Sequence, residues 1–95
     1  MKLIGFEWDE GNLKRILTRM EAGVAEMAFQ GDPWVTLSKK FSGSEKRWFL
    51  INKVMGRYVF IVFTARNNKV RIISARYMHP KEVKHYEEKF QKEGD

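Results

Sequence analysis

Apolar residues in the first third of the chain recur at the three- and four-residue spacing of an α-helix. Asp9, followed three residues later by Asn12, is typical of a helix start. A second helical pattern covers residues 21–30, with the break between the helices at residues 19–21, and a Gly-Asp-Pro sequence at residues 31–33 ends the helical region. The positions with helical spacing in the first helix are Leu13, Ile16, Leu17 and Met20.

After residue 33 the pattern changes to the apolar and polar stretches typical of strands. Short turns at residues 54–56 and 66–68 separate three of these stretches, which predicts an antiparallel meander. Pro80 suits the first turn of a final helix that extends to about residue 92. The expected strands cover residues 34–38, 47–52, 57–64 and 69–76, and a short edge strand is expected at residues 2–6.

This order of elements predicts an α+β fold. Helices lie near both ends of the chain and the strands are grouped in the middle, which favours helices packed on one face of an antiparallel sheet. A length of 95 residues corresponds to one domain. We find no repeat, low-complexity run or linker that would divide it.

Positive charge is concentrated in the middle of the chain. Residues 33–81 contain eleven lysines and arginines and one acid, Glu45, whereas residues 1–32 and 82–95 each have a net charge of −2. Such a distribution attracts polyanions, nucleic acid above all. The alternative is a solvated, lysine-rich surface, because strands commonly carry lysine and arginine outward.

The residue types argue against several kinds of site. The chain has no cysteine, so disulfides, thiolate metal sites and a cysteine nucleophile are excluded. His79 and His85 are six positions apart, a poor spacing for a shared metal, and we expect no metal and no cofactor. The N-terminal residues lack the apolar stretch of a signal peptide, and the longest apolar run, residues 58–63, is far shorter than the ~20 residues that span a bilayer. We therefore expect a cytoplasmic protein without membrane contact.

The stretch at residues 69–76 contains candidate phosphate-binding residues. Arg71 lies between apolar neighbours, which is unusual for an arginine without a role, and the planar guanidinium suits phosphate geometry. Because side chains alternate along a strand, Arg71 and Arg76 point to opposite faces, and both reach one site only if a bulge or the strand end re-aims one of them. The alternative is that either arginine pairs with Glu45 or Glu82.

Glu45 and Tyr86 are candidates for proton transfer. Glu45, isolated among cations, suits a general base, or it neutralises a neighbouring cation. Tyr86 shares a helical face with Glu82 four residues before it, and it would donate a proton, stack on a base or pack the last helix onto the sheet. Arg47 is a phosphate clamp or an outward strand cation, and its neighbours leave both alternatives open.

In several segments the chain resembles the BrnT family of toxins. In chain order the segments are Phe6-Glu7-Trp8-Asp9, Asp32-Pro33, Glu45-Lys46-Arg47-Trp48, Val62-Phe63-Thr64 and Val70-Arg71-Ile72-Ile73-Ser74-Ala75-Arg76, followed by Glu82 and Tyr86. They extend over about residues 4–88, so we expect a single BrnT-like domain over residues 1–95. The resemblance implies a RelE-like fold with N-terminal helices, an antiparallel sheet and a C-terminal helix, which agrees with the pattern-based prediction.

The resemblance also implies an activity and partners. BrnT toxins cleave RNA and arrest growth, and a BrnA-type antitoxin with a ribbon-helix-helix DNA-binding part neutralises them. The toxin–antitoxin complex represses its own operon, so operator DNA is contacted only through that complex. For this chain the resemblance implies RNA as the substrate and a BrnA-like antitoxin as the partner.

The resemblance places candidate site residues on one active surface. The expected reaction needs no metal, and a ribose 2′-hydroxyl attacks the neighbouring phosphate. Arg71 and Arg76 would stabilise the additional charge of the transition state, and Glu45 or Tyr86 would transfer the proton, with base and acid left unassigned. The residues expected to contact RNA are Arg47, Lys39, Lys40, Lys46 and Glu82.

The chain departs from the family pattern at two places. The family commonly has Lys-His-Gly between the first helices, where this chain has Leu17-Thr18-Arg19, and an acid often stands where this chain has Ala65. The missing histidine keeps alternatives open. These are a nucleic-acid-binding module without catalysis, a degenerate toxin that retains only antitoxin binding, and an interaction protein whose basic face docks an acidic antitoxin segment.

Overall fold

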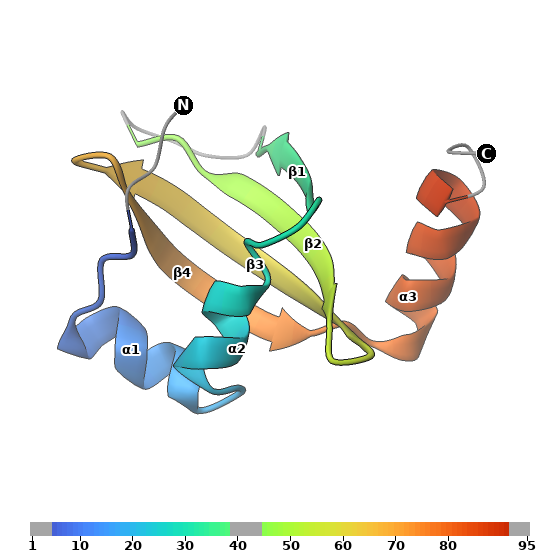
Figure 1. The fold of residues 1–95 in the computed structure, drawn as a ribbon, viewed down its shortest axis with the longest axis horizontal. Coiled ribbons are helices and arrows are strands. Elements are labelled where there is room, and N and C mark those ends of the chain that lie inside the picture. The colour runs from blue at the N-terminus through green and yellow to red at the C-terminus, as the bar shows by residue number, and fades with distance from the viewer. Residues whose placement is uncertain (1–4, 39–44, 92–95) are drawn as a thin grey trace.

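A computed structural model describes residues 5–38 and 45–91 of the chain (Figure 1). Within these residues it confirms the α+β prediction, because N-terminal helices precede an antiparallel sheet and a C-terminal helix follows it. The elements are α1 (Glu10–Leu17), α2 (Ala22–Met27), β1 (Trp34–Leu37), β2 (Trp48–Val54), β3 (Arg57–Arg66), β4 (Lys69–Tyr77), α3 (Pro80–Tyr86) and η1 (Glu87–Gln91), a π-helical continuation of α3.

The strands form an antiparallel meander in the order β1-β2-β3-β4. Both tight hairpin turns have positive φ at their two central residues, Met55 and Gly56 in the first and Asn67 and Asn68 in the second. This geometry matches the right-handed twist of the flanking strands, so it is favoured in two-residue hairpins. The predicted turns are therefore confirmed, and they set the pairing of β2 with β3 and of β3 with the start of β4.

The start of α1 is held by the predicted cap. The Asp9 carboxylate accepts a hydrogen bond from the Asn12 backbone amide, and the Asn12 side chain accepts one from the Asp9 amide. Asn12 is buried and its Nδ2 also donates to the carbonyl oxygens of Glu7 and Ile72. Because Ile72 belongs to β4, this side chain fixes α1 against the edge of the sheet.

The hydrophobic core lies between one face of the sheet and the helices α1 and α2 (Figure 1). Asn52 of β2 joins the end of α2 to this face, since its Nδ2 donates to the carbonyl oxygens of Ala28 and Gln30. The most deeply buried side chains of this core include Ile16, Ala25, Leu50, Ile61 and Ile72.

The expectation that all helices pack on one sheet face is wrong for α3. The ring of Tyr86 lies 5.5 Å from that of Tyr58 and 6.4 Å from that of Trp34, measured between centroids. Tyr58 and Trp34 have the opposite strand parity from the core residues Leu50 and Val59. The last helix therefore contacts the far face of the sheet, and in Figure 1 it stands apart from α1 and α2.

The predicted N-terminal edge strand is reduced to a single parallel bridge in the described residues. Phe6 pairs with Val70 of β4, with the Val70 amide donating to the Gly5 carbonyl and the Glu7 amide to the Val70 carbonyl. Residues 2–4 of the expected strand lie outside the described part of the chain. The bridge nevertheless positions Glu7 and Asp9 beside β4.

Candidate functional site

A β-bulge in β4 decides which face its arginines occupy. Val62 pairs with Ser74 while Phe63 pairs with Ile72, which leaves Ile73 without an opposite residue on β3. Arg71 is consequently opposite Thr64 and Arg76 is opposite Phe60, so both arginines share one face. The sequence predicted that the two arginines share a face only if a bulge or the strand end re-aims one of them, and this bulge does so. The shared face is the one opposite the α1–α2 core.

Arg71 is held by the acidic residues that precede α1. Its Nη1 donates to Asp9 Oδ2 at 2.6 Å and to Glu7 Oε1 at 3.2 Å, and its Nη2 donates to Asp9 Oδ1 at 3.3 Å. The hydrogen bond from Arg71, with a smaller one from Asn12, lowers the pKa of Asp9. Arg71 therefore pairs with Glu7 and Asp9, and the pairing with Glu45 or Glu82 that was considered as an alternative does not occur for it.

Arg71 lines a hollow of about 260 Å³ on this face, which we call the arginine hollow. Arg47, which directly precedes β2, contributes to it together with Thr64 of β3 and Arg71 of β4, and Arg15 reaches it from α1. Among the described residues, no ion pair or hydrogen bond engages the guanidinium of Arg47 or Arg15. The lining residues are Gly11, Asn12, Arg15, Glu45, Arg47, Thr64, Arg66, Arg71 and Ile73.

Glu45 belongs to the same hollow. Its Oε1 accepts a hydrogen bond of 2.7 Å from Arg66 Nε, and Arg66 Nη1 lies 3.9 Å from Glu7 Oε1. About a third of the Glu45 side chain is exposed. The structure thus brings together three of the sequence-predicted residues, Glu45, Arg47 and Arg71, in one cationic hollow.

Sequence reasoning missed several residues of this hollow, among them Arg15, Thr64 and Arg66. A signal for Thr64 and Arg66 was present, because counting back from the β2–β3 turn places Thr64 opposite Arg47 and Arg66 opposite Glu45. The Thr64 side chain is buried and its hydroxyl donates at 2.6 Å to the carbonyl oxygen of Lys46, which ties down the backbone between Glu45 and Arg47. Arg15 had no such signal, since only the packing of α1 on β4 brings it here.

The other sequence-predicted residues gather near the end of β4. Arg76 forms a bidentate pair with Glu82, with Nη1–Oε1 and Nη2–Oε2 distances of 2.7 and 2.9 Å. Glu82 Oε1 also accepts the His79 amide hydrogen bond at the start of α3, and these contacts, Arg76 first, lower the pKa of Glu82 to about 2. The alternative that Arg76 pairs with Glu82 is therefore confirmed.

Tyr86 and Glu82 line a second hollow of about 340 Å³ on the same sheet face, which we call the apolar hollow. Burial raises the pKa of the Tyr86 hydroxyl, with a smaller contribution from Asp32. The lining residues are Ile51, Phe60, Met78, Lys81, Glu82, His85 and Tyr86.

The structure does not bring Arg71 and Arg76 to the same hollow. Their partners on β3, Thr64 and Phe60, are four positions apart, which corresponds to about 13 Å along a strand. Lys46 is exposed two residues before β2, whereas Lys39 and Lys40 lie outside the described residues. The candidate site therefore consists of two hollows that open on one face.

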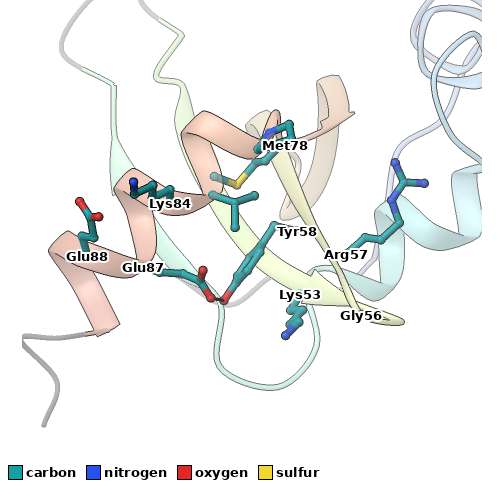
Figure 2. A pocket seen from close by; sticks show the side chains of 10 residues that line it. Lys53, Gly56, Arg57, Tyr58, Met78, Lys84, Glu87 and Glu88 are labelled. Atoms are coloured by element: carbon teal, nitrogen blue, oxygen red, sulfur yellow. Dashed lines mark hydrogen bonds between the residues drawn. The ribbon is translucent and has the colours of Figure 1, made fainter.

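A larger hollow of about 550 Å³ lies between the β2–β3 turn and the last helix (Figure 2). Tyr58 points into it and donates a hydrogen bond of 3.3 Å to Glu87. Its charged lining residues have both signs, namely Lys53, Arg57, Lys84, Glu87 and Glu88. None of the sequence-predicted site residues lines this hollow, so its size does not make it the candidate site.

Within residues 5–38 and 45–91, no three His, Asp or Glu side chains gather closely enough to hold a metal ion. No helix in this part of the chain is both long and apolar enough to cross a membrane.

Residues 8–82 match the family described as the ribonuclease toxin, BrnT, of type II toxin-antitoxin systems. The match covers most of the chain and includes both hollows except for His85 and Tyr86. No curated protein and no solved structure matches the chain significantly. With an arginine-lined face built on the predicted fold, the chain belongs to the BrnT family of ribonuclease toxins of type II toxin–antitoxin systems.

Proposed function

We propose that the protein is an endoribonuclease that cleaves RNA without a metal ion, and that the reacting phosphate binds in the arginine hollow. The observation that carries the proposal is that Arg47, just before β2, lines one hollow with Thr64 of β3 and Arg71 of β4, and that Glu45 lines it too. Cations that are fixed before the substrate arrives stabilise charge that develops on a phosphate in the transition state.

Arg71 is prepared for this role by its carboxylate partners. Asp9 and Glu7 use three of the five guanidinium N–H groups, so the Nε–H and one Nη2–H engage no acceptor among the described residues. These groups form one edge of the guanidinium fork, which suits two phosphate oxygens. Asp9 and Glu7 thus orient Arg71 and need not leave it when RNA binds.

Glu45 is the proposed general base. Arg66 holds its Oε1, and its Oε2 accepts no hydrogen bond within the described residues. In the reaction this carboxylate takes the proton of the ribose 2′-hydroxyl, and the 2′ oxygen forms a bond to phosphorus. The bond from phosphorus to the 5′ oxygen breaks, and that oxygen takes a proton from water. The products are a 2′,3′-cyclic phosphate and a free 5′-hydroxyl.

Arg76, Glu82 and Tyr86 have a different role in this proposal. Arg76 lies about 13 Å along the sheet from Arg71, and Glu82 and Tyr86 line the apolar hollow near it, so these residues contact RNA beside the reacting phosphate. Lys46, Lys39 and Lys40 hold the RNA backbone by charge alone.

A type II toxin implies an antitoxin partner. We propose that this partner is a BrnA-like protein with a ribbon-helix-helix part, that the complex alone contacts operator DNA, and that the toxin acts in the cytoplasm.

One observation favours a second candidate, a degenerate toxin that retains antitoxin or RNA binding without cleavage. The ion pairs Asp9–Arg71, Glu7–Arg71 and Arg66–Glu45 join much of the hollow into one network. Such a network also stabilises a fold with no catalytic purpose.

The test is RNA cleavage by the purified protein in the presence of EDTA, with the product ends identified. We expect cyclic phosphate ends, and Arg47→Ala, Arg71→Ala and Glu45→Gln should each lower the rate by about 10²–10³. Arg57→Ala is the matched control, because it removes an equal charge from a guanidinium that stacks 3.5 Å from the Tyr77 ring outside the hollow.

Cleavage that disappears with EDTA, or that survives the Arg47 and Arg71 substitutions, contradicts the proposal. A folded wild-type protein that binds RNA and never cleaves it supports the degenerate-toxin alternative.

A further inference from the structure

The apolar hollow has the construction of a binding site for a flat ring. Its floor contains Ile51 and Phe60, which pair directly across β2 and β3, and Tyr86 of α3 forms a wall. Phe60 and Tyr86 are half-buried, whereas Ile51 is buried. Its volume of about 340 Å³ lies within the usual range for small-ligand pockets, about 300–1,000 Å³.

Fixed polar groups surround this apolar floor. The Arg76 guanidinium lies 5.0 Å from the centre of the Phe60 ring and is held there by Glu82. Lys81 and His85 also line the hollow. An apolar and aromatic floor beside oriented donors is the chemistry that recognises an unpaired nucleobase, whose flat face is apolar and whose edge accepts hydrogen bonds.

The position of the hollow relates it to the arginine hollow. Both open on the same sheet face, and the separation of about 13 Å between Thr64 and Phe60 is one that an extended single strand spans in about two nucleotides. A strand whose phosphate lies between Arg47 and Arg71 therefore places a nearby base over Phe60.

We propose that the apolar hollow is a subsite for one unpaired nucleobase of the RNA, about two nucleotides from the phosphate in the arginine hollow. This inference rests on the proposed function, since it takes the bound phosphate as its reference. The subsite selects single-stranded RNA, because a base inside a duplex cannot reach Phe60. It also determines which sequences are cleaved, because Arg76 and Lys81 meet the edge of the base.

The occupant is a base and not an apolar side chain of the antitoxin, because of the charge around the hollow. Lys81 lines the hollow, and Arg76 lies beside it with its guanidinium 5.0 Å from the Phe60 ring. Glu82 is the acidic residue among the lining residues, and it is already paired with Arg76. The hollow also continues the cationic face that begins at Arg47. A polyanion complements both features.

The experiment measures binding and not cleavage, so that it does not depend on the nuclease activity. A short RNA with a 2′-deoxy substitution at the cleavable linkage is prepared with an abasic site at each successive position. We expect one abasic position to weaken binding to the wild-type protein about tenfold. Phe60→Leu should bind intact RNA about tenfold more weakly than the wild type does. The abasic site at that position should not weaken the binding of Phe60→Leu further, because the effects of removing two groups that contact each other do not add.

Phe49→Leu is the matched control. Phe49 lies on the same face with its ring 5.5 Å from that of Phe60, but it does not line the apolar hollow. Its abasic profile should equal that of the wild type. If Phe60→Leu does not fold, the wild-type protein is titrated with RNA that carries 2-aminopurine at each position. One position should then show a fluorescence change that the others lack.

The subsite proposal is overturned if no abasic position weakens binding and no 2-aminopurine position changes its fluorescence. It is also overturned if the protein does not bind RNA. An equal abasic profile for the wild type and Phe60→Leu overturns it as well. If Phe60→Leu instead weakens antitoxin binding while the abasic scan is flat, the hollow belongs to the antitoxin. Failure of the nuclease proposal is distinguishable, because RNA that binds with a clear abasic position and is never cut refutes cleavage and supports the subsite.

Discussion

Arg71 Nη1 lies 2.6 Å from Asp9 Oδ2, so the residue that caps α1 also orients an arginine of β4. The two residues are 62 positions apart in the chain. The other carboxylate oxygen of Asp9 accepts the Asn12 amide hydrogen bond of the cap. One side chain thus connects the start of the helix to the arginine hollow.

Asp9→Asn should separate these roles. Asparagine is as good an N-cap as aspartate, and an exposed ion pair contributes little to stability, so α1 should persist and the unfolding free energy should change little. The loss of the charged partner leaves Arg71 poorly oriented, and we expect kcat to fall about tenfold to a hundredfold while RNA binds slightly more tightly. Steady-state kinetics and RNA titration of the same protein measure both effects.

The control for this prediction is Asp9→Ala, which removes the cap as well and should cost about 1 kcal/mol of unfolding free energy. An unchanged kcat in Asp9→Asn contradicts the proposed orienting role of Asp9.

Asn12→Ala should be strongly destabilising for its size. Asn12 is 5% exposed, and its removal leaves the carbonyl oxygens of Glu7 and Ile72 without their side-chain donor. Unsatisfied buried groups of this kind cost about 1–3 kcal/mol each, so we expect a loss of about 2–4 kcal/mol in urea unfolding. Lys14→Ala, an exposed position on the same helix, should change stability by no more than about 0.5 kcal/mol. Equal effects of the two substitutions would refute the importance of these hydrogen bonds.

Thr64→Val should affect the arginine hollow without changing its charge. Valine has the shape of threonine but lacks the hydroxyl that donates to the Lys46 carbonyl. We expect a loss of about 1–3 kcal/mol in stability and reduced cleavage, because the backbone that carries Glu45 and Arg47 is released. Thr64→Ser retains the hydroxyl and should retain more of the activity. The hypothesis fails if the serine variant is cleavage-deficient and the valine variant is not.

Glu82→Gln should lower the unfolding free energy by an amount that depends on pH. Its pKa is about 2 in the folded protein and near the model-peptide value of 4.5 when unfolded, so the carboxylate stabilises the fold fully above about pH 5. This contribution is lost as the pH falls from about 4.5 towards 2. Because the side chain is 41% exposed, solvent screening limits it to about 1 kcal/mol.

The measurement is the unfolding free energy of Glu82→Gln and of the wild-type protein at several pH values. Their difference should be constant above about pH 5 and decrease at lower pH. A difference that does not change with pH contradicts the low pKa.

The sequence by itself determined the elements whose cause is local. The capping residues Asp9 and Asn12 act within one helical turn, and the turns at residues 55–56 and 67–68 act within a few positions. The alternation of side chains along a strand is equally local, and in the structure Leu50 and Ile61 share the buried face. These interactions join near neighbours in the chain, so a pattern of residues is sufficient to predict them.

The tertiary structure alone decided how the candidate residues divide into two hollows. The bulge at Ile73 moves Arg76 to the face of Arg71, and the residue types in β4 do not predict that bulge. The pairing of Arg71 with Asp9 and the packing of α3 on the far face join segments that are distant in the chain. Such contacts depend on how whole elements pack against each other, which is why local patterns indicated candidate residues such as Arg71 and Arg76 but not their arrangement.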